Sequence, residues 1–312
     1  MTTHRGVYFL ANDRVIELAI AFLNSFRHYN PTIPLCLIPY ASDLQEISKL
    51  AEKYKFSIFS DQEILRECDR SSECIHGRIY GEFRKQSAWM GEFDQFFYID
   101  IDTVVLQNIE FAFSFLSDYA FVASQSNTPG LTSFVWKKSI HSANTLTNEQ
   151  IEFSANMGCF ASRRGAVTLE DIADRLLSAR PLIPHMALDY PDQGWLNYLV
   201  TTTCDRYTSL GVLRDKLGDS VPGEVWAGGK GASVRNGRII YQGTELKNIF
   251  LVHWAGEWQP KECEWAAYHE AIAAGLEAPR PVIGASMPYR EFWNAFRYLE
   301  DCELESLLRE LY

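Results

Sequence analysis

Positive charge is in short supply in this chain of 312 residues. Lysine and arginine total 29 against 40 aspartates and glutamates, which gives a formal net charge of −11. A nucleic-acid-binding protein normally presents a basic face, and binding to anionic lipid also depends on basic residues. The composition therefore argues against nucleic acid and against anionic membranes as partners.

Cysteine pairs and long apolar runs are also missing. The seven cysteines are odd in number and none is spaced as C-x-x-C, which favours reduced thiols over a disulfide framework or a zinc site. No stretch has the length and apolarity of a signal peptide or of a transmembrane helix. We therefore expect a soluble, cytoplasmic protein.

The chain contains neither an internal repeat nor a low-complexity linker, so we expect one large domain over residues 1–264. Strands alternating with helices predict an α/β fold with a mostly parallel sheet flanked by helices. The polar stretch 127–147 is predicted to be a loop and 153–162 a strand. Residues 265–312 are helical in pattern and are expected to form a C-terminal extension, packed on the core or on a partner. Four apolar runs have the pattern of buried strands, at residues 6–11, 33–38, 56–59 and 96–99.

The stretch 95–108, QFFYIDIDTVVLQN, is the most informative part of the sequence. Its apolar run ends at Asp100, and Asp102 follows two places later, so both carboxylates can face one point beyond the strand. Ligands of open α/β sheets bind at that edge, and a divalent metal that carries a phosphorylated substrate would neutralise two carboxylates there. A turn and a helix N-cap remain an alternative role for the pair.

His253 directly follows a second predicted strand, 249–252. A single histidine is most often only a hydrogen-bonded residue. Here Trp254-Ala255-Gly256 comes next, where backbone N–H groups could approach an anion. Together with Asp100 and Asp102, the imidazole would make a suitable ligand set for Mn²⁺, with Mg²⁺ as the alternative ion.

The segment YIDIDTVVLQNI resembles the D-x-D strand of the retaining glycosyltransferases of the glycogenin and lipopolysaccharide-galactosyltransferase type, which share the GT-A fold. Other segments resemble elements of that family in the same order, and the matches span about residues 6–261. FLAND is similar to the first strand with its nucleoside-contacting turn, and RKQSAWMGEFD to the lysine-bearing helix. NMG, DQGWLN and HWAGEWQP are similar to the N-x-G, D-Q-x-x-x-N and H-x-x-G-x-x-K-P elements.

This resemblance implies metal-dependent transfer of a sugar from a nucleotide-diphospho-sugar, above all a UDP-sugar, to a hydroxyl acceptor with retention of configuration. It implies Asp100, Asp102 and His253 as metal ligands. It also places Asp192 and Gln193 beside the reacting sugar, and it implies that Asp192 positions this sugar. Two alternative roles for Asp192 are a catalytic nucleophile and a helix N-cap without a catalytic role. The donor-binding residues that it implies are Ala11, Asn12, Asp13, Lys85, Asp100, Ile101, Asn156, Gly158, Gly256 and Lys261.

Two residues depart from the family pattern. Val15 stands where the family usually has an aromatic residue against the base, which puts recognition of uridine in doubt. Gln259 stands where the family has a phosphate-binding lysine, and Lys261 could supply that charge if the loop bends differently. Lys85 and the metal would otherwise neutralise the diphosphate.

Three other functions are alternatives to sugar transfer. DIDTV also approximates the nucleophile motif of haloacid-dehalogenase-like phosphatases, but that motif usually opens the fold, and about a hundred residues precede it here. A sugar nucleotidyltransferase would need a Gly-rich, Arg-containing loop after the first strand, and FLANDRV is not one. A catalytically silent family member that acts as a binding or scaffold protein is the alternative outside enzymes. The helical stripe of Tyr289–Leu311 suggests a homodimer through the C-terminal helix as a further possibility.

Overall fold

The chain forms two compact units, neither of which is a continuous piece of chain. The first comprises Met1–Arg14, Asn30–Asp100 and Asn108–Gly223, and the second comprises Val15–Tyr29, Ile101–Gln107 and Glu224–Tyr312. The computed structural model describes residues 3–128, 130–228, 232–235, 238–241, 244–245, 247–282, 284 and 287–299.

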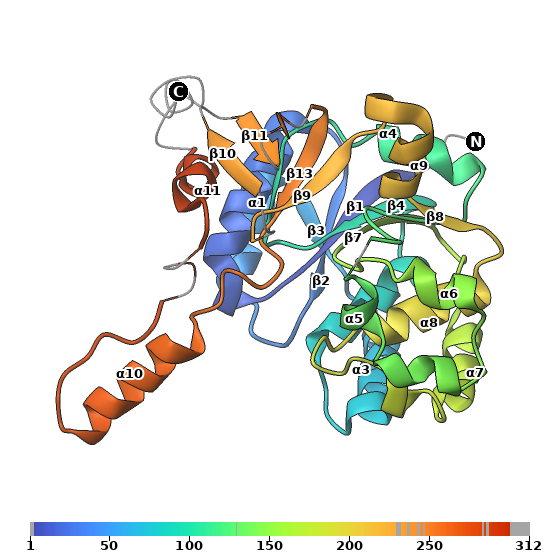
Figure 1. Ribbon diagram of the computed structural model, residues 1–312. Coiled ribbons are helices and arrows are strands. Elements are labelled where there is room, and N and C mark those ends of the chain that lie inside the picture. Colours follow the sequence, from blue (N-terminus) through green and yellow to red (C-terminus); the bar gives the residue numbers. More distant parts are fainter. Residues whose placement is uncertain are drawn as a thin grey trace. The chain divides into compact units, whose positions relative to one another are not determined.

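The first unit contains a seven-stranded sheet (Figure 1). Its strands in spatial order are β3 (Phe56–Ile58), β2 (Leu35–Pro39), β1 (Arg5–Ala11), β4 (Gln95–Ile99), β7 (Cys159–Arg163), β6 (Phe121–Ala123) and β8 (Tyr207–Ser209). Strands β3, β2, β1 and β4 run parallel, β7 is antiparallel to both of its neighbours, and β6 is parallel to β8. The predicted α/β fold with a mostly parallel sheet is confirmed.

Strand β4 lies in the middle of this sheet because its residues are apolar on both faces. Phe96 to Ile99 are completely buried. In the register of the sheet, Tyr98 pairs with Tyr8 on one side and with Phe160 on the other, and its ring stacks on that of Phe160 with centroids 5.2 Å apart. Burial of each such side chain stabilises the fold by roughly 1.5–3 kcal/mol. This packing fixes the end of β4, where Asp100 follows.

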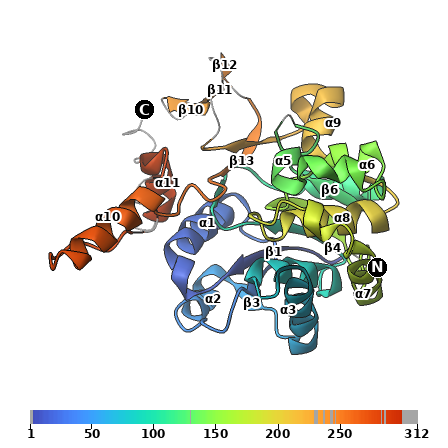
Figure 2. The same ribbon diagram turned by 60° about the horizontal axis from the view of Figure 1, so that its bottom comes forward.

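Helices flank the sheet, and α3, α6, α7 and α8 pack against one another (Figures 1 and 2). Their starts follow local rules: the Asp61 carboxylate accepts from two N–H groups at the start of α3, and Thr168 forms a capping box at α7. The α-helices of this unit are α2 (Ala51–Tyr54), α3 (Gln62–His76), α4 (Phe111–Ser114), α5 (Thr132–Val135), α6 (Asn148–Phe153), α7 (Leu169–Ala179), α8 (Gln193–Thr203) and α9 (Leu210–Leu217). The 3-10 helices within it are η2 (Ile47–Leu50), η3 (Gly81–Met90), η4 (Phe115–Ser117), η5 (Lys138–Ser142), η6 (Ile183–His185) and η7 (Gly218–Ser220).

The second unit combines helices with two small sheets. One sheet has the order β5 (Thr103–Val105), β13 (Ile249–His253) and β9 (Gly223–Trp226), and the other consists of β10 (Ala232–Arg235), β11 (Arg238–Tyr241) and β12 (Thr244–Glu245). The helices are α1 (Ile16–Tyr29), α10 (Glu262–Ala273) and α11 (Arg290–Arg297); a 3-10 turn, η1 (Asp13–Val15), precedes α1.

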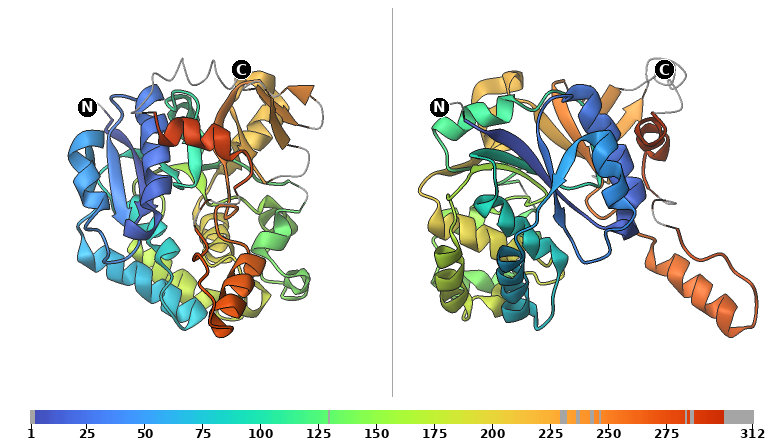
Figure 3. Two further views of the ribbon diagram at one scale, coloured as in Figure 1. Left: turned by 90° about the vertical axis from the view of Figure 1, so that its left-hand side faces the viewer. Right: turned by 180° about the vertical axis from the view of Figure 1, so that it is seen from behind.

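Helix α1 is the packing centre of the second unit. It contacts β5, where the Ser25 hydroxyl accepts from the Val105 N–H at 3.0 Å. It also contacts α11, and the Asn24 amide donates to the Phe296 carbonyl at 2.9 Å. Figure 3 shows α11 beside α1. Of the predicted helix Tyr289–Leu311, the structure describes α11, and residues 300–312 lie outside the described part.

Among the described residues, no helix has the length and apolarity needed to span a bilayer.

Candidate functional site

Asp100 directly follows β4, in the first unit. Its backbone N–H donates to the Gly158 carbonyl at 2.7 Å, and the Tyr98 hydroxyl donates to its Oδ1 at 2.6 Å. Its Oδ2 lies 3.2 Å from the Lys85 Nζ. One backbone contact and two carboxylate contacts therefore hold Asp100 at the end of the central strand.

Lys85 lies on η3 and is an almost completely buried cation, with its side chain 3% exposed. Its Nζ lies 2.8 Å from Asp192 Oδ2, in addition to the contact with Asp100, and 5.2 Å from the centroid of the Tyr98 ring. Burial alone would lower the pKa of Lys85, but the charges of Asp100 and Asp192 outweigh it and raise that pKa. The ammonium is therefore charged and shared by two carboxylates.

Asp192 occupies the N-cap position of α8, which is the alternative role given to it from the sequence. However, its side chain makes no capping hydrogen bond. Its carboxylate is turned toward Lys85 instead. The side chain is 6% exposed. A charged group this deeply buried needs a partner of opposite charge, and Lys85 provides it.

Segment 156–158, NMG, adjoins these carboxylates. The Met157 carbonyl accepts from Lys85 at 3.4 Å, and its N–H donates to the Gln193 Oε1 at 3.3 Å. Asn156 Oδ1 accepts from the Gly158 N–H at 3.0 Å, which fixes the turn. The first unit thus brings together six of the predicted site residues: Lys85, Asp100, Asn156, Gly158, Asp192 and Gln193.

The predicted nucleoside-contacting turn, Ala11 to Asp13, begins at the last residue of β1. Because β1 and β4 are parallel neighbours, their carboxyl ends lie at the same edge of the sheet. Asn12 is buried and its amide donates to the Asp43 carboxylate at 3.1 Å. Asp13 Oδ1 accepts from the backbone N–H groups of residues 46–47. In these contacts, the two polar side chains hold the neighbouring loop.

Asp102 lies in the second unit, just ahead of β5. Its Oδ1 is 3.2 Å from His253 Nε2, and its Oδ2 accepts from the Gly256 N–H at 3.1 Å and from the Trp258 indole at 2.9 Å. Burial alone would raise the pKa of Asp102, but His253 and these donors lower it to about 2. Asp102 is therefore a carboxylate throughout the physiological range.

His253 ends β13 and lies between two carboxylates. Its Nε2 faces Asp102, and its Nδ1 lies 2.6 Å from Glu224 Oε1 on β9. Burial alone would lower the pKa of His253, but Asp102 and then Glu224 raise it well above its usual value. Glu224 is not recognisable as a site residue from the sequence, because the short strand that carries it has no clear apolar alternation.

The remaining predicted residues of the second unit are placed as follows. Ile101 is buried, and Gly256 adopts φ +82°, a conformation that favours glycine. Lys261 is exposed at the N-cap of α10, where its backbone N–H donates to the Glu264 carboxylate at 2.7 Å. Gln259 donates its N–H to the Gly256 carbonyl at 3.1 Å. Among the described contacts, none brings Lys261 to Asp102 or His253.

Asp100, Asp102 and His253 are a group of residues that could hold a metal ion. The alternative role of the aspartate pair as a helix N-cap is wrong, because residues 100–102 connect β4 to β5 and no helix of the described chain begins there. The phosphatase alternative expects its motif at the start of the fold, whereas here the motif follows the fourth strand.

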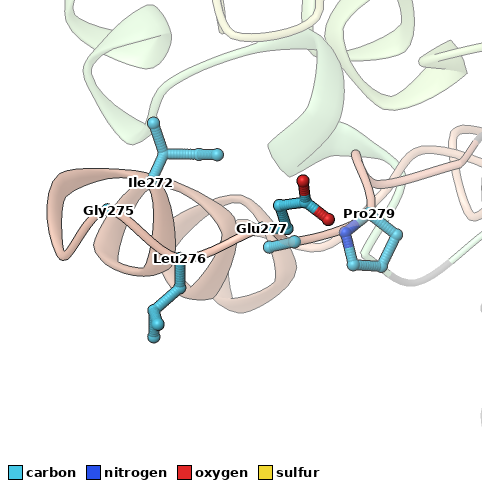
Figure 4. A pocket seen from close by; sticks show the side chains of 6 residues that line it. Ile272, Gly275, Leu276, Glu277 and Pro279 are labelled. Carbon is cyan, nitrogen blue, oxygen red and sulfur yellow. The ribbon is translucent and has the colours of Figure 1, made fainter.

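A pocket lies elsewhere, at the C-terminal end of α10 (Figure 4). Its lining residues are Ile272, Gly275, Leu276, Glu277, Ala278 and Pro279. It contains none of the predicted site residues, and Ile272 and Leu276 are about half exposed or more. The pocket is therefore separate from the candidate metal ligands.

No protein-family model matches the sequence, and no curated protein matches it either. The structure is similar to that of the bifunctional glycosyltransferase WbbM, with a TM-score of 0.53 and 14% identity, over 83% of this chain and 48% of WbbM. The chain has the GT-A fold. This chain spans about half the length of WbbM.

Two further solved structures are similar over most of their length. The galactosyltransferase LgtC, in complex with donor and acceptor sugar analogues, gives a TM-score of 0.49 and 10% identity, over 88% of this chain and 97% of LgtC. Mouse xyloside xylosyltransferase 1 gives a TM-score of 0.49 and 11% identity, over 81% of this chain and 97% of that protein.

Proposed function

We propose that this chain is a metal-dependent glycosyltransferase that moves a sugar from a nucleotide-diphospho-sugar, above all a UDP-sugar, to a hydroxyl acceptor. The observation that carries the proposal is the pair Asp102–His253, in which Asp102 lies two residues after Asp100, in a chain with the GT-A fold. The fold provides the framework, and the D-I-D segment provides ligands for an ion at the end of its central strand.

The donor set fits a divalent cation. Two ligand atoms at about 2.1 Å from an ion, in adjacent octahedral positions, lie about 3.0 Å apart. The Asp102 Oδ1 and His253 Nε2 are separated by 3.2 Å, close to that value. Asp100 is two residues from Asp102, so covalent geometry keeps their Cα atoms within about 7 Å. Two carboxylate oxygens and one imidazole nitrogen suit Mn²⁺.

A divalent cation held by Asp100, Asp102 and His253 would stabilise the negative charge that develops on the leaving diphosphate. The chain's own residues prepare that site. Tyr98 and Lys85 fix the orientation of Asp100 through contacts at 2.6 and 3.2 Å. We therefore infer that Lys85 acts on the donor mainly by positioning Asp100 and by adding positive charge beside it.

Asp192 and Gln193 are proposed to position the transferred sugar. Asp192 is held by Lys85, and Gln193 is held by the Met157 N–H within the NMG turn. The resemblance of these segments to retaining enzymes supports retention of the anomeric configuration, with the acceptor's proton passing to the leaving phosphate. The sugar is transferred to a hydroxyl group, and the molecule that carries this hydroxyl group is to be identified by assay.

A thermal-shift screen of nucleotide-sugars, with and without Mn²⁺, tests the proposal. A donor that binds only the native state should add ~2.7 kcal/mol of stability when present at about a hundred times its Kd. Asp102→Asn should abolish Mn²⁺-dependent binding of UDP in calorimetry. Asp118→Asn changes an exposed carboxylate and is the matched control. Unchanged UDP binding in the Asp102 variant would rule out the metal site.

Hydrolysis of the bound donor separates an enzyme from a binding or scaffold protein with the same site. An enzyme releases free sugar slowly in the absence of an acceptor, whereas a silent family member binds the donor and leaves it intact. Product stereochemistry, read by nuclear magnetic resonance, then tests retention.

The C-terminal extension, residues 265–312, is proposed to pack on protein. Its described helix α11 lies on α1, and Arg297 forms an ion pair with Glu17 at 2.6 Å. A homodimer through this region stays a prediction. Light scattering of the full chain and of a chain that ends at residue 284 tests it, because a dimer held by this region falls from the mass of two chains to that of one, whereas a monomer loses only the mass of the removed segment.

A further inference from the structure

Glu224 is an acidic side chain with no exposed surface. It lies on β9, which adjoins β13 in the small sheet of the second unit (Figure 1). The N–H of Ala227 donates to the carbonyl of His253 at 2.8 Å, so the two strands are held in a fixed register. Burial of an isolated carboxylate is costly, and its presence here calls for a specific partner.

That partner is the imidazole of His253. The Glu224 Oε1 lies 2.6 Å from the His253 Nδ1, slightly shorter than the about 2.7–2.9 Å of most charge-assisted N–H···O hydrogen bonds. The same oxygen accepts from the Trp226 indole at 3.1 Å. Trp226 is two residues along the strand from Glu224, and such residues project to the same side.

A carboxylate can only accept a hydrogen bond, so His253 donates through Nδ1–H. In the neutral imidazole, which is the form that binds a metal, this fixes the tautomer and leaves the lone pair of Nε2 on the opposite side of the ring. Nε2 is the atom that faces Asp102. Glu224 thus determines which nitrogen is available as a ligand, and it prevents rotation of the ring.

We propose that Glu224 is a positioning residue that orients His253 for divalent-metal binding through its contact with Nδ1. The inference rests on the proposed function, because it assigns a role toward the metal of that same site. A histidine ligand commonly donates its other ring N–H to a carboxylate, and loss of such a partner costs about 10–100-fold in metal affinity.

The experiment measures the Kd of Mn²⁺ alone for the full chain, by electron paramagnetic resonance of the free ion. Glu224→Leu removes the acceptor and nearly keeps the volume, and Glu224→Gln keeps an acceptor oxygen without the charge. Trp226→Phe removes a donor to Glu224 and leaves the imidazole contact intact, so it is the control. Circular dichroism and melting without metal show whether each variant folds.

We expect Glu224→Leu to raise the Kd of Mn²⁺ about 10–100-fold. Glu224→Gln should have a smaller effect, and Trp226→Phe should stay within about threefold of the wild type. A merely structural role predicts something different: the variants would melt earlier, yet the folded protein would bind Mn²⁺ with unchanged Kd. That result overturns the inference.

The controls distinguish failure of the inference from failure of the proposed function. If the wild type binds Mn²⁺, Asp102→Asn abolishes binding and Glu224→Leu leaves it intact, then the inference is wrong and the metal site stands. If the wild type binds no Mn²⁺, both are wrong. If Glu224→Leu does not fold, Glu224→Gln carries the test, and an unchanged Kd in that variant counts against the inference.

Discussion

Replacement of Lys85 by methionine is the most direct test of how the first unit holds its carboxylates. Methionine is close to lysine in length and is compatible with a buried site, so the change removes the charge and little else. The side chains of Lys85 and Asp192 are 3% and 6% exposed and their charged atoms are 2.8 Å apart. Loss of the ammonium leaves Asp192 as a buried carboxylate without its cation.

The magnitude follows from that geometry. Removal of one partner of a buried ion pair costs about 3–5 kcal/mol, because the other charge stays buried and uncompensated. For a domain of roughly 150–250 residues, 1 kcal/mol corresponds to about 2–4 °C in Tm, so Lys85→Met should lower Tm by roughly 6–20 °C. Differential scanning calorimetry of wild type and variant measures the shift.

A double-mutant cycle shows whether the pair is responsible. Asp192→Asn removes the carboxylate that Lys85→Met leaves unpaired, so the double variant should be more stable than the sum of the two single effects predicts. Additive effects, or a Lys85→Met variant that melts with the wild type, would refute the reasoning. In that case the ammonium would contribute no net stability.

Three further predictions follow from other contacts. Gly91→Ala places a methyl group against the buried Tyr8 hydroxyl, so it should cost about 1–3 kcal/mol in urea denaturation; an unchanged midpoint would contradict the packing. Burial, followed by the charge of Asp192, raises the pKa of Glu82, so its contribution to stability is present below the ordinary glutamate pKa and is lost as pH rises through the folded pKa. Glu82→Gln should therefore be more stable than the wild type at about pH 8 but not at about pH 4, and equal effects at both would refute this. Gln259→Lys should leave the donor KM unchanged or lower it, and a raised KM would argue against a diphosphate near this loop.

The sheet and the end of its central strand were predictable because local sequence determines them. Residues Phe96 to Ile99 make both faces of their strand apolar, a pattern that is typical of a strand buried inside a sheet and not of an exposed strand. The secondary structure of residues 127–162 was predicted less well. The predicted loop contains two short helices, α5 and η5, and the predicted strand from Phe153 begins only at Cys159. The capping box of Thr147 and Gln150, which starts α6, was the overlooked signal.

The candidate site was predictable where residues are close in sequence and not where distant strands meet. Asp100 and Asp102 are in one motif, but Glu224 reaches His253 only through the pairing of β9 with β13. The direction of the Asp192 side chain is a similar case. Its position before a helix is typical of an N-cap, and only the buried charge of Lys85 decides that it turns away.

The discontinuous second unit has a consequence for synthesis of the chain. Helix α1 is made early, but its partners in that unit arrive late: Val105 follows Ser25 by 80 residues, and Phe296 follows Asn24 by 272. At about 5–20 residues per second, the second interval lasts roughly 14–54 s. Throughout it, the surface of α1 that α11 will cover is uncovered on the nascent chain. If the ribosome stalls late in the message, the incomplete chain exposes the apolar side chains of α1 that α11 would cover. We expect such incomplete chains to be bound by chaperones or to aggregate.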